Sequence, residues 1–169
     1  MFDFNQIYEA HKDLVYNLAF QYVQQAEEAE EIMQDVFLRI HEKRQNFREE
    51  ATLKTWIYRI TVNRSIDFLR SKKRKNTLLS LFFLSKKDDP ENNKWYHPGF
   101  SLEQQEKVQA IFKIINSLPP QQKSALLLVK MEGLSMKECA SVLNTSEKAI
   151  ESLLSRAKFT LKNKLSNEG

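Results

Sequence analysis

Residues 52–75 read TLKTWIYRITVNRSIDFLRSKKRK. Apolar side chains recur along this stretch at helical spacing, at Leu53, Trp56, Ile57 and Ile60. Polar and aromatic side chains lie between them, at Lys54, Tyr58, Arg59, Asn63 and Arg64. Five of the six residues from Arg70 to Lys75 are basic. The pattern predicts an amphipathic helix with one apolar stripe, a face of aromatic, amide and cationic groups, and a cationic end.

Two interpretations fit this helix. Cations neutralise phosphates, aromatic rings stack on unpaired bases and asparagine bonds base edges, so the helix suits nucleic acid. The same pattern also describes an amphipathic core helix with a solvated charged face. The segments on either side of the helix decide between the two.

Composition indicates an all-α, globular protein. The chain has 169 residues, enough for one average domain or two small ones, with 41% hydrophobic and 28% charged side chains and a formal charge of +4. It contains three glycines and four prolines, and period-two alternation is absent. We therefore expect helices throughout.

Two helices are predicted before the quoted stretch, over 4–23 and 26–44. The second has apolar residues at i, i+3, i+4 and i+7 spacing, namely Ala29, Ile32, Met33, Val36, Phe37 and Ile40. Acids cluster on its other face, which by itself fits a solvated surface. A short polar connection containing Phe47 follows. Three helices within residues 1–75 predict a small N-terminal bundle.

Residues 76–100 interrupt the helical pattern and are interpreted as a linker between two domains. They begin with an apolar patch, Leu78–Leu84, that allows an extension of the third helix or a docking surface for a partner. We expect this patch to pack against the chain's own domain.

Residues 101–169 predict a C-terminal domain of four helices that includes a helix-turn-helix. Helices are expected over 101–116 and about 120–132, and Gly133 is placed to cap the second one. Ser135 and Glu138 form a capping box for the next helix, and Asn144 suits the turn that follows. Thr145 and Ser146 then cap a long final helix. Its polar residues available to the major groove are Lys148, Ser152, Ser155, Arg156, Lys158 and Lys162.

The sequence contains no catalytic or cofactor motif, so we expect neither enzymatic activity, nor a cofactor, nor a metal. His11, His41 and His97 lack metal-ligand spacing, and phosphate-loop and nucleophile-elbow patterns are absent. The one cysteine, Cys139, is expected to be a small core residue. Because the N-terminus lacks a signal-peptide pattern and no apolar run reaches about 20 residues, we expect a cytoplasmic protein without membrane insertion.

Three blocks of sequence together resemble bacterial extracytoplasmic-function (group IV) sigma factors. Residues 26–42 (AEEAEEIMQDVFLRIHE) resemble the family's acidic helix. Residues 47–75 resemble its Phe…Trp-Leu-x-x-Ile-x-x-Asn-x-x-x-Asp-x-x-Arg segment. Residues 118–165 resemble its C-terminal domain, with the Leu-Pro opening, Glu-Gly-Leu-Ser turn and Ser-Arg-Ala ending. The resemblance implies a region 2-like domain over 1–75, a linker over 76–100 and a region 4-like domain over 101–169.

The resemblance implies two partners, core RNA polymerase and promoter DNA. Polymerase is expected to bind the acidic helix, at Glu28, Glu31, Gln34, Asp35, Leu38 and Arg39. Promoter melting is expected to use Phe47, Trp56, Arg59, Asn63 and Arg64, with a flipped base held by Phe47 and Asn63. Phosphates are expected to bind Arg70, Lys72, Lys73 and Arg74, and Asp67 is expected to pair with a neighbouring cation. The final helix is expected to read the upstream element through Lys148, Ser152, Ser155, Arg156 and Lys158.

The family resemblance also implies a linker that runs towards the polymerase RNA channel and an anti-sigma factor as regulatory partner. One departure concerns the final helix, where Glu151 and Leu153 occupy positions that are commonly basic in the family. Glu151 suits a cytosine amine but weakens phosphate affinity. The main hypothesis is thus a dissociable initiation factor. The alternatives are a stand-alone helix-turn-helix regulator of duplex operators and a helical adaptor that uses only the acidic helix.

Overall fold

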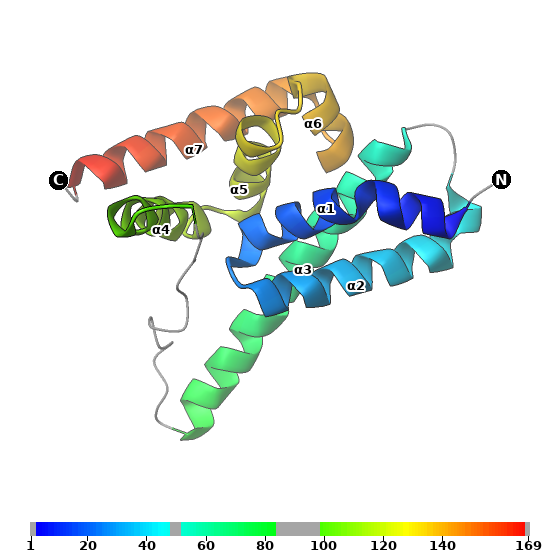
Figure 1. Cartoon of the computed structure of the whole chain (residues 1–169). Coiled ribbons are helices and arrows are strands. Elements are labelled where there is room, and N and C mark those ends of the chain that lie inside the picture. Colours follow the sequence, from blue (N-terminus) through cyan, green and yellow to red (C-terminus); the bar gives the residue numbers. More distant parts are fainter. Residues whose placement is uncertain (1–2, 48–51, 84–98, 168–169) are drawn as a thin grey trace. The chain divides into compact units, whose positions relative to one another are not determined.

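The computed structural model describes residues 3–47, 52–83 and 99–167. The chain divides into two compact units, Met1–Lys94 and Trp95–Gly169. Within the described residues, all regular structure is helical (Figure 1). The predicted all-α fold class is confirmed.

The first unit is built on a three-helix bundle of α1 (Phe4–Val23), α2 (Ala26–Lys43) and α3 (Leu53–Phe83). Each helix packs against the other two. The core is formed by large side chains that are at most 1% exposed, among them Leu18, Tyr22, Ile32, Ile40 and Ile57. Full burial of one such side chain stabilises the fold by about 1.5–3 kcal/mol. The apolar stripes therefore determine how the helices pack.

Local contacts set the ends of α1. The Asp3 carboxylate accepts hydrogen bonds from the backbone N–H groups of Asn5 and Gln6, at 3.0 and 3.3 Å, and so caps the first turn. The helix ends at Gln24, whose φ of 53° is left-handed although the residue is not glycine. The backbone N–H of Gln24 donates to the Phe20 carbonyl at 2.7 Å. This turn leads directly into α2, which begins two residues later.

The third helix is longer than the sequence predicted. Residues 76–83, part of the predicted linker, continue α3 beyond Lys75. The stretch 76–83 has neither glycine nor proline, so nothing in it ends the helix. Contrary to expectation, its side chains at Leu78, Leu79, Leu81 and Phe82 are 54–77% exposed. The reason is visible in Figure 1, where the second half of α3 projects beyond α1 and α2. Leu84 and the rest of the predicted linker, 84–98, lie outside the described residues.

The second unit contains α4 (Leu102–Asn116), α5 (Pro120–Leu126), the helical turn η3 (Leu127–Met131), α6 (Met136–Leu143) and α7 (Glu147–Asn167). The long helix α7 packs against α4, α5 and α6. Where a continuous α-helix was predicted over about 120–132, residues 127–131 form a π-helical turn, and the Glu132 N–H donates to the Leu127 carbonyl at 3.0 Å. Such turns insert one extra residue into the helical repeat, which the apolar spacing does not reveal.

The predicted signals of the helix-turn-helix are confirmed. Ser135 and Glu138 form a reciprocal capping box, with bonds of 2.8 and 3.1 Å. Asn144 is left-handed at a φ of 53°, and the Ser146 hydroxyl accepts from the Ala149 N–H at 3.1 Å to cap α7. Gly133, with a φ of +72°, lies just after the preceding helical segment.

A buried lysine joins α4 to α5. Lys123 is only 4% exposed, and its Nζ donates to Asn116 Oδ1 at 2.9 Å. Burial lowers the pKa of this amine from 10.5 to about 8, because the charged form loses its hydration. The folded chain thus prefers the neutral amine at a pH where the unfolded chain still holds the proton.

This lysine predicts a stability that rises with pH. Between pH 8 and pH 10 the unfolded state binds more protons at Lys123 than the folded state does, so the free energy of unfolding increases by about 2 kcal/mol. Thermal unfolding followed by circular dichroism at both pH values measures this change. The matched variant Lys123→Met lacks the titrating amine and is expected to lose the increase. An identical pH response in the two chains contradicts the prediction.

Candidate functional site

The outer face of α2 has an acidic character with one large apolar side chain. Glu31, Gln34 and Arg39 are exposed, and Leu38 is 61% exposed among them. Glu28 and Asp35 are half-buried because they turn towards α3. All six residues predicted to bind polymerase therefore reach the surface of α2. Four of them face solvent, and the other two, Glu28 and Asp35, lie at the contact with α3.

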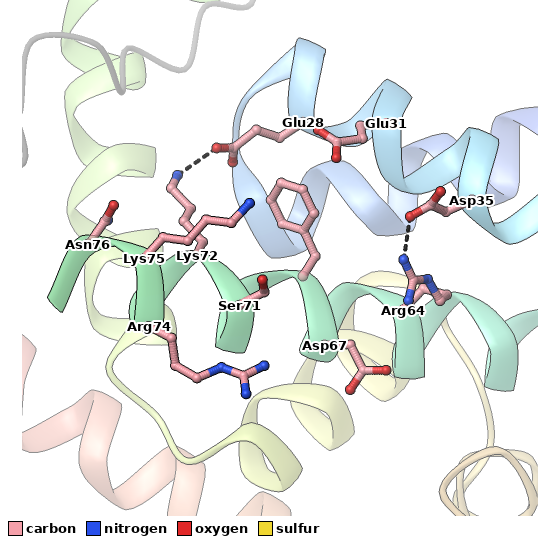
Figure 2. Close-up of a pocket in the computed structure, with 11 residues that line it drawn as sticks. Glu28, Glu31, Asp35, Arg64, Asp67, Ser71, Lys72, Arg74, Lys75 and Asn76 are labelled. Atoms are coloured by element: carbon pink, nitrogen blue, oxygen red, sulfur yellow. Dashed lines mark hydrogen bonds and ion pairs between the residues drawn. The ribbon is translucent and has the colours of Figure 1, made fainter. Parts of the chain in front are cut away.

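Two ion pairs connect α2 to α3 (Figure 2). Asp35 Oδ2 accepts from Arg64, and Glu28 Oε1 accepts from Lys72 Nζ at 2.6 Å. Sequence reasoning missed both pairs and assigned their acids to polymerase and their cations to DNA. The sequence did contain a signal for these pairs. The two acids are seven residues apart and the two cations eight, which is about two turns on each helix, so two helices packed side by side can bring both pairs together.

The pairs border a groove of about 430 Å³ between the two helices. Glu28, Glu31 and Asp35 of α2 line it from one side, and Arg64, Asp67, Phe68, Ser71, Lys72, Arg74, Lys75 and Asn76 of α3 line it from the other. Asp67 and Arg74 point away from α2 in Figure 2. Asp67 pairs with Arg70 at 3.8 Å, as the sequence predicted, although both side chains are more than half exposed. Such exposed pairs contribute about 1 kcal/mol or less.

Aromatic rings meet at the start of α3. Phe47, just before the connection to α3, lies with its ring centroid 5.2 Å from that of Trp56, and the planes are tilted by 48°. The Thr52 hydroxyl accepts from the Thr55 N–H at 3.1 Å and caps this first turn. Asn63 is exposed seven residues after Trp56, on the same side of the helix and about 10 Å along it. The structure therefore aligns an aromatic pair and an amide on one face of α3.

The cations of α3 point in two directions, some along the face of Trp56 and Asn63 and others towards α2. Arg70 and Arg74 follow Asn63 at intervals of seven and eleven residues, which places them on the face of Trp56 and Asn63, and both are exposed. Arg59 is half-buried near this face, and Lys73 is exposed beside it. Arg64 and Lys72 instead turn towards α2, as described above.

One aromatic residue lies differently from the sequence expectation. Tyr58, grouped with the polar face of the quoted stretch, is only 4% exposed and belongs to the core. Thr61 and Ser65 are also fully buried on that side of α3. The Thr61 hydroxyl is satisfied in the core because it donates to the Ile57 carbonyl at 2.8 Å, so the spacing of apolar residues alone does not define the core face of α3.

A second, smaller hollow of about 340 Å³ lies beside Phe47, lined also by Asp3, Gln6, Ile7, Ala10, His11 and Leu53. Burial and the nearby Lys54 lower the pKa of His11, so the imidazole is neutral at pH 7. The walls of this hollow come from α1 and the start of α3, together with Phe47.

The final helix presents its polar residues to solvent. Lys148, Ser152, Ser155, Arg156 and Lys158 are all exposed on α7, as is Glu151. Ile150, Leu154 and Ala157 are at most 2% exposed and fix the helix against its unit. Cys139, fully buried on α6, has a pKa raised to about 11 by burial, so its thiol is not a nucleophile at neutral pH. In the part of the chain that the structure describes, no three metal-ligating side chains gather.

Family comparisons match both units. The Sigma-70 region 2 model matches residues 7–75, and the Sigma-70 region 4 model matches residues 109–161. The chain is 30% identical over 161 residues to a probable RNA polymerase sigma factor of Haemophilus influenzae, covering 86% of this chain and 81% of that relative. It is 28% identical over 158 residues to the ECF RNA polymerase sigma factor SigM of Mycobacterium tuberculosis, covering 94% and 74%.

Solved structures show the same fold. The sigma factor RpoE from Bartonella quintana, in complex with the anti-sigma factor NepR, superposes with a TM-score of 0.71 at 23% identity, covering 97% of each chain. CnrH, in complex with the cytosolic domain of CnrY, gives 0.70 at 19% identity, covering 98% of this chain and 89% of that one. A region 2 unit followed by a region 4 unit defines a protein of the sigma-70 class. The chain belongs to the extracytoplasmic-function group of RNA polymerase sigma factors. No helix among its described residues is both long and apolar enough to span a bilayer.

Proposed function

We propose that the chain is a dissociable initiation factor that binds core RNA polymerase and directs it to promoters, without enzymatic activity of its own. The observation that carries the proposal is the arrangement of two faces within one three-helix unit. The acidic face of α2, with Leu38 exposed, suits a protein partner, and the Trp56–Asn63 face of α3 suits unpaired DNA.

Polymerase binding is assigned to the α2 face, at Glu28, Glu31, Gln34, Asp35, Leu38 and Arg39. An exposed leucine surrounded by charges is typical of an anchor with a polar rim, which is how protein interfaces are built. The acids then pair with basic groups of the polymerase and fix the orientation.

Promoter opening is assigned to the α3 face, at Phe47, Trp56, Arg59 and Asn63, and to Arg64 once its pair with Asp35 opens. The Phe47–Trp56 pair provides a stacking surface for an unpaired base, and the exposed Asn63 provides an amide donor and acceptor. Arg70, Lys73 and Arg74 hold phosphates beside it, and Lys72 joins them once its pair with Glu28 opens.

The second unit is assigned to the upstream promoter element. The capped helix-turn-helix presents α7 to the major groove, with Lys148, Ser152, Ser155, Arg156 and Lys158 as contacts. We assign polymerase binding and melting to residues 1–75, duplex recognition to 101–169, and connection between them to 76–100. A cytoplasmic location follows from these partners.

An anti-sigma factor is the regulatory partner that we propose. The sigma factor RpoE, which has the same fold, was captured with the anti-sigma factor NepR, and CnrH, also of this fold, was captured with the cytosolic domain of CnrY. The exposed apolar end of α3 and the acidic face of α2 supply surface for such a partner.

Co-elution with core polymerase tests the proposal. The purified chain, mixed with core enzyme and passed over a gel-filtration column, is expected to elute with the polymerase in equal amounts. A stand-alone regulator of duplex operators elutes separately and shifts promoter DNA without polymerase. That result overturns the proposal in favour of the helix-turn-helix alternative.

A further inference from the structure

Four charged side chains tie the polymerase face to the DNA face. We call Glu28, Asp35, Arg64 and Lys72 the α2–α3 latch. Its two pairs join residues 29 and 44 positions apart in the sequence and hold the two helices side by side (Figure 2). Each pair contains one acid assigned above to polymerase and one cation assigned above to DNA.

The pairs are sheltered enough to form and exposed enough to exchange partners. The side chains of Glu28 and Arg64 are 17% and 23% exposed, and those of Asp35 and Lys72 are 36% and 38% exposed. Each pair this close to water changes the equilibrium between its closed and open forms by a factor of about five or less. A partner with better geometry therefore displaces it. A fully buried pair does not exchange in this way, because breaking it leaves a charge without solvent or partner.

The latch also has unused bonding capacity. Glu28 Oε2 and Arg64 Nε are buried and, among the described residues, have no hydrogen-bond partner. A carboxylate and a guanidinium each form stronger bonds when both of their edges are engaged. The internal pairs therefore leave each group with one unbonded atom, which an external partner reaches only after the pair has opened.

We propose that the latch couples the two binding events, a proposal that rests on the proposed function. In the free chain the acids hold Arg64 and Lys72 away from DNA and also repel phosphates. When basic groups of the polymerase take Glu28 and Asp35, the two cations are released to phosphates. Each partner thus removes an interaction that opposes the other, which is positive coupling in the thermodynamic sense.

Binding of the free, full-length chain to a short DNA duplex tests the latch without polymerase. The double variant Glu28→Gln with Asp35→Asn releases both cations, whereas Glu27→Gln with Glu30→Gln makes the same change of charge at exposed positions of the same helix. We expect the latch variant to bind about fivefold to tenfold more tightly than the control. Its log affinity against log salt is expected to be steeper by about 1.8, because each new phosphate contact adds about 0.9 to the slope.

Two further chains keep the test decisive. The single variant Glu28→Gln is expected to give about half of the slope change, and it disturbs the fold less. Adding Arg64→Gln and Lys72→Gln to the double variant is expected to abolish its gain in affinity and its steeper salt dependence, because the two released cations are then absent. Circular dichroism confirms that each variant is folded.

Equal affinities and slopes for the latch variant and its control overturn the coupling. That outcome leaves the proposed function intact if native chain still elutes with core polymerase. Failure of the native chain to bind polymerase overturns the proposed function instead, whatever the salt slopes are.

Discussion

Replacing Asp35 with arginine and Gln34 with alanine is expected to lower the affinity for core polymerase at least about 100-fold. Charge reversal at the centre of an interface places like charges together, which costs several kcal/mol, and a 100-fold loss corresponds to about 2.7 kcal/mol. Gln34 is exposed one turn before the exposed Leu38, and the half-buried Asp35 lies next to Gln34 on the side that turns towards α3. Titration of fluorescently labelled chain with core enzyme measures the loss.

Loss of the internal Asp35–Arg64 pair does not explain such an effect. The pair is partly exposed and contributes about 1 kcal/mol or less to stability, so the bundle remains folded. Asp13→Arg reverses an exposed charge on α1, which carries none of the residues assigned to polymerase, and is expected to bind polymerase within threefold of the native chain. If the control loses as much affinity as the double variant, α2 does not bind through the assigned face.

Truncating Asn63 to alanine is expected to lower strand opening about 10- to 100-fold while changing duplex binding less than twofold. An amide that bonds a flipped base contributes only once the base has left the stack, and such contacts are worth about 1–3 kcal/mol. Asn63 is exposed on the same side of α3 as Trp56, so removing it leaves the core untouched. Promoter DNA with a fluorescent base reports opening in the presence of polymerase, and mobility shift reports duplex binding.

Two control variants distinguish loss of strand opening from loss of duplex binding. Asn17→Ala removes an exposed asparagine from α1 and is expected to open promoters as the native chain does. Lys73→Ala is expected to weaken duplex binding and make its salt dependence shallower by about 0.9. Equal loss of opening and duplex binding in Asn63→Ala would count against the base-holding role.

Local signals predicted most of the fold. The helix over 4–23 is observed at Phe4–Val23, and the helix over 26–44 at Ala26–Lys43, because their apolar stripes and flanking turns act over a few residues. The capping box at Ser135 and the turn at Asn144 were readable for the same reason. The left-handed turn at Gln24 could not be predicted, because such a turn at a residue other than glycine or asparagine has no sequence signature.

What the sequence did not predict depends on distant contacts. The sequence left the extension of α3 to Phe83 open, because the apolar run at 78–84 suits a longer helix as well as a docking surface. Tyr58 was placed on the wrong face because the core side of α3 is set by α1 and α2, not by the stripe alone.

The ion pairs of the candidate site also depend on contacts between residues far apart in the sequence. Asp35 and Arg64 are 29 residues apart, so their meeting depends on how α2 packs against α3. The sequence predicted a functional role for both residues, and the packing adds that they are bound to each other. Their roles toward polymerase and DNA stay predictions.

Transcription from a genomic library with purified core polymerase tests the central claim most directly. Run-off RNA is collected with and without the chain, and the start sites are sequenced. The account predicts defined start sites, downstream of a shared upstream element, that appear only when the chain is present. Identical RNA in both reactions, with no site that depends on the chain, would contradict it.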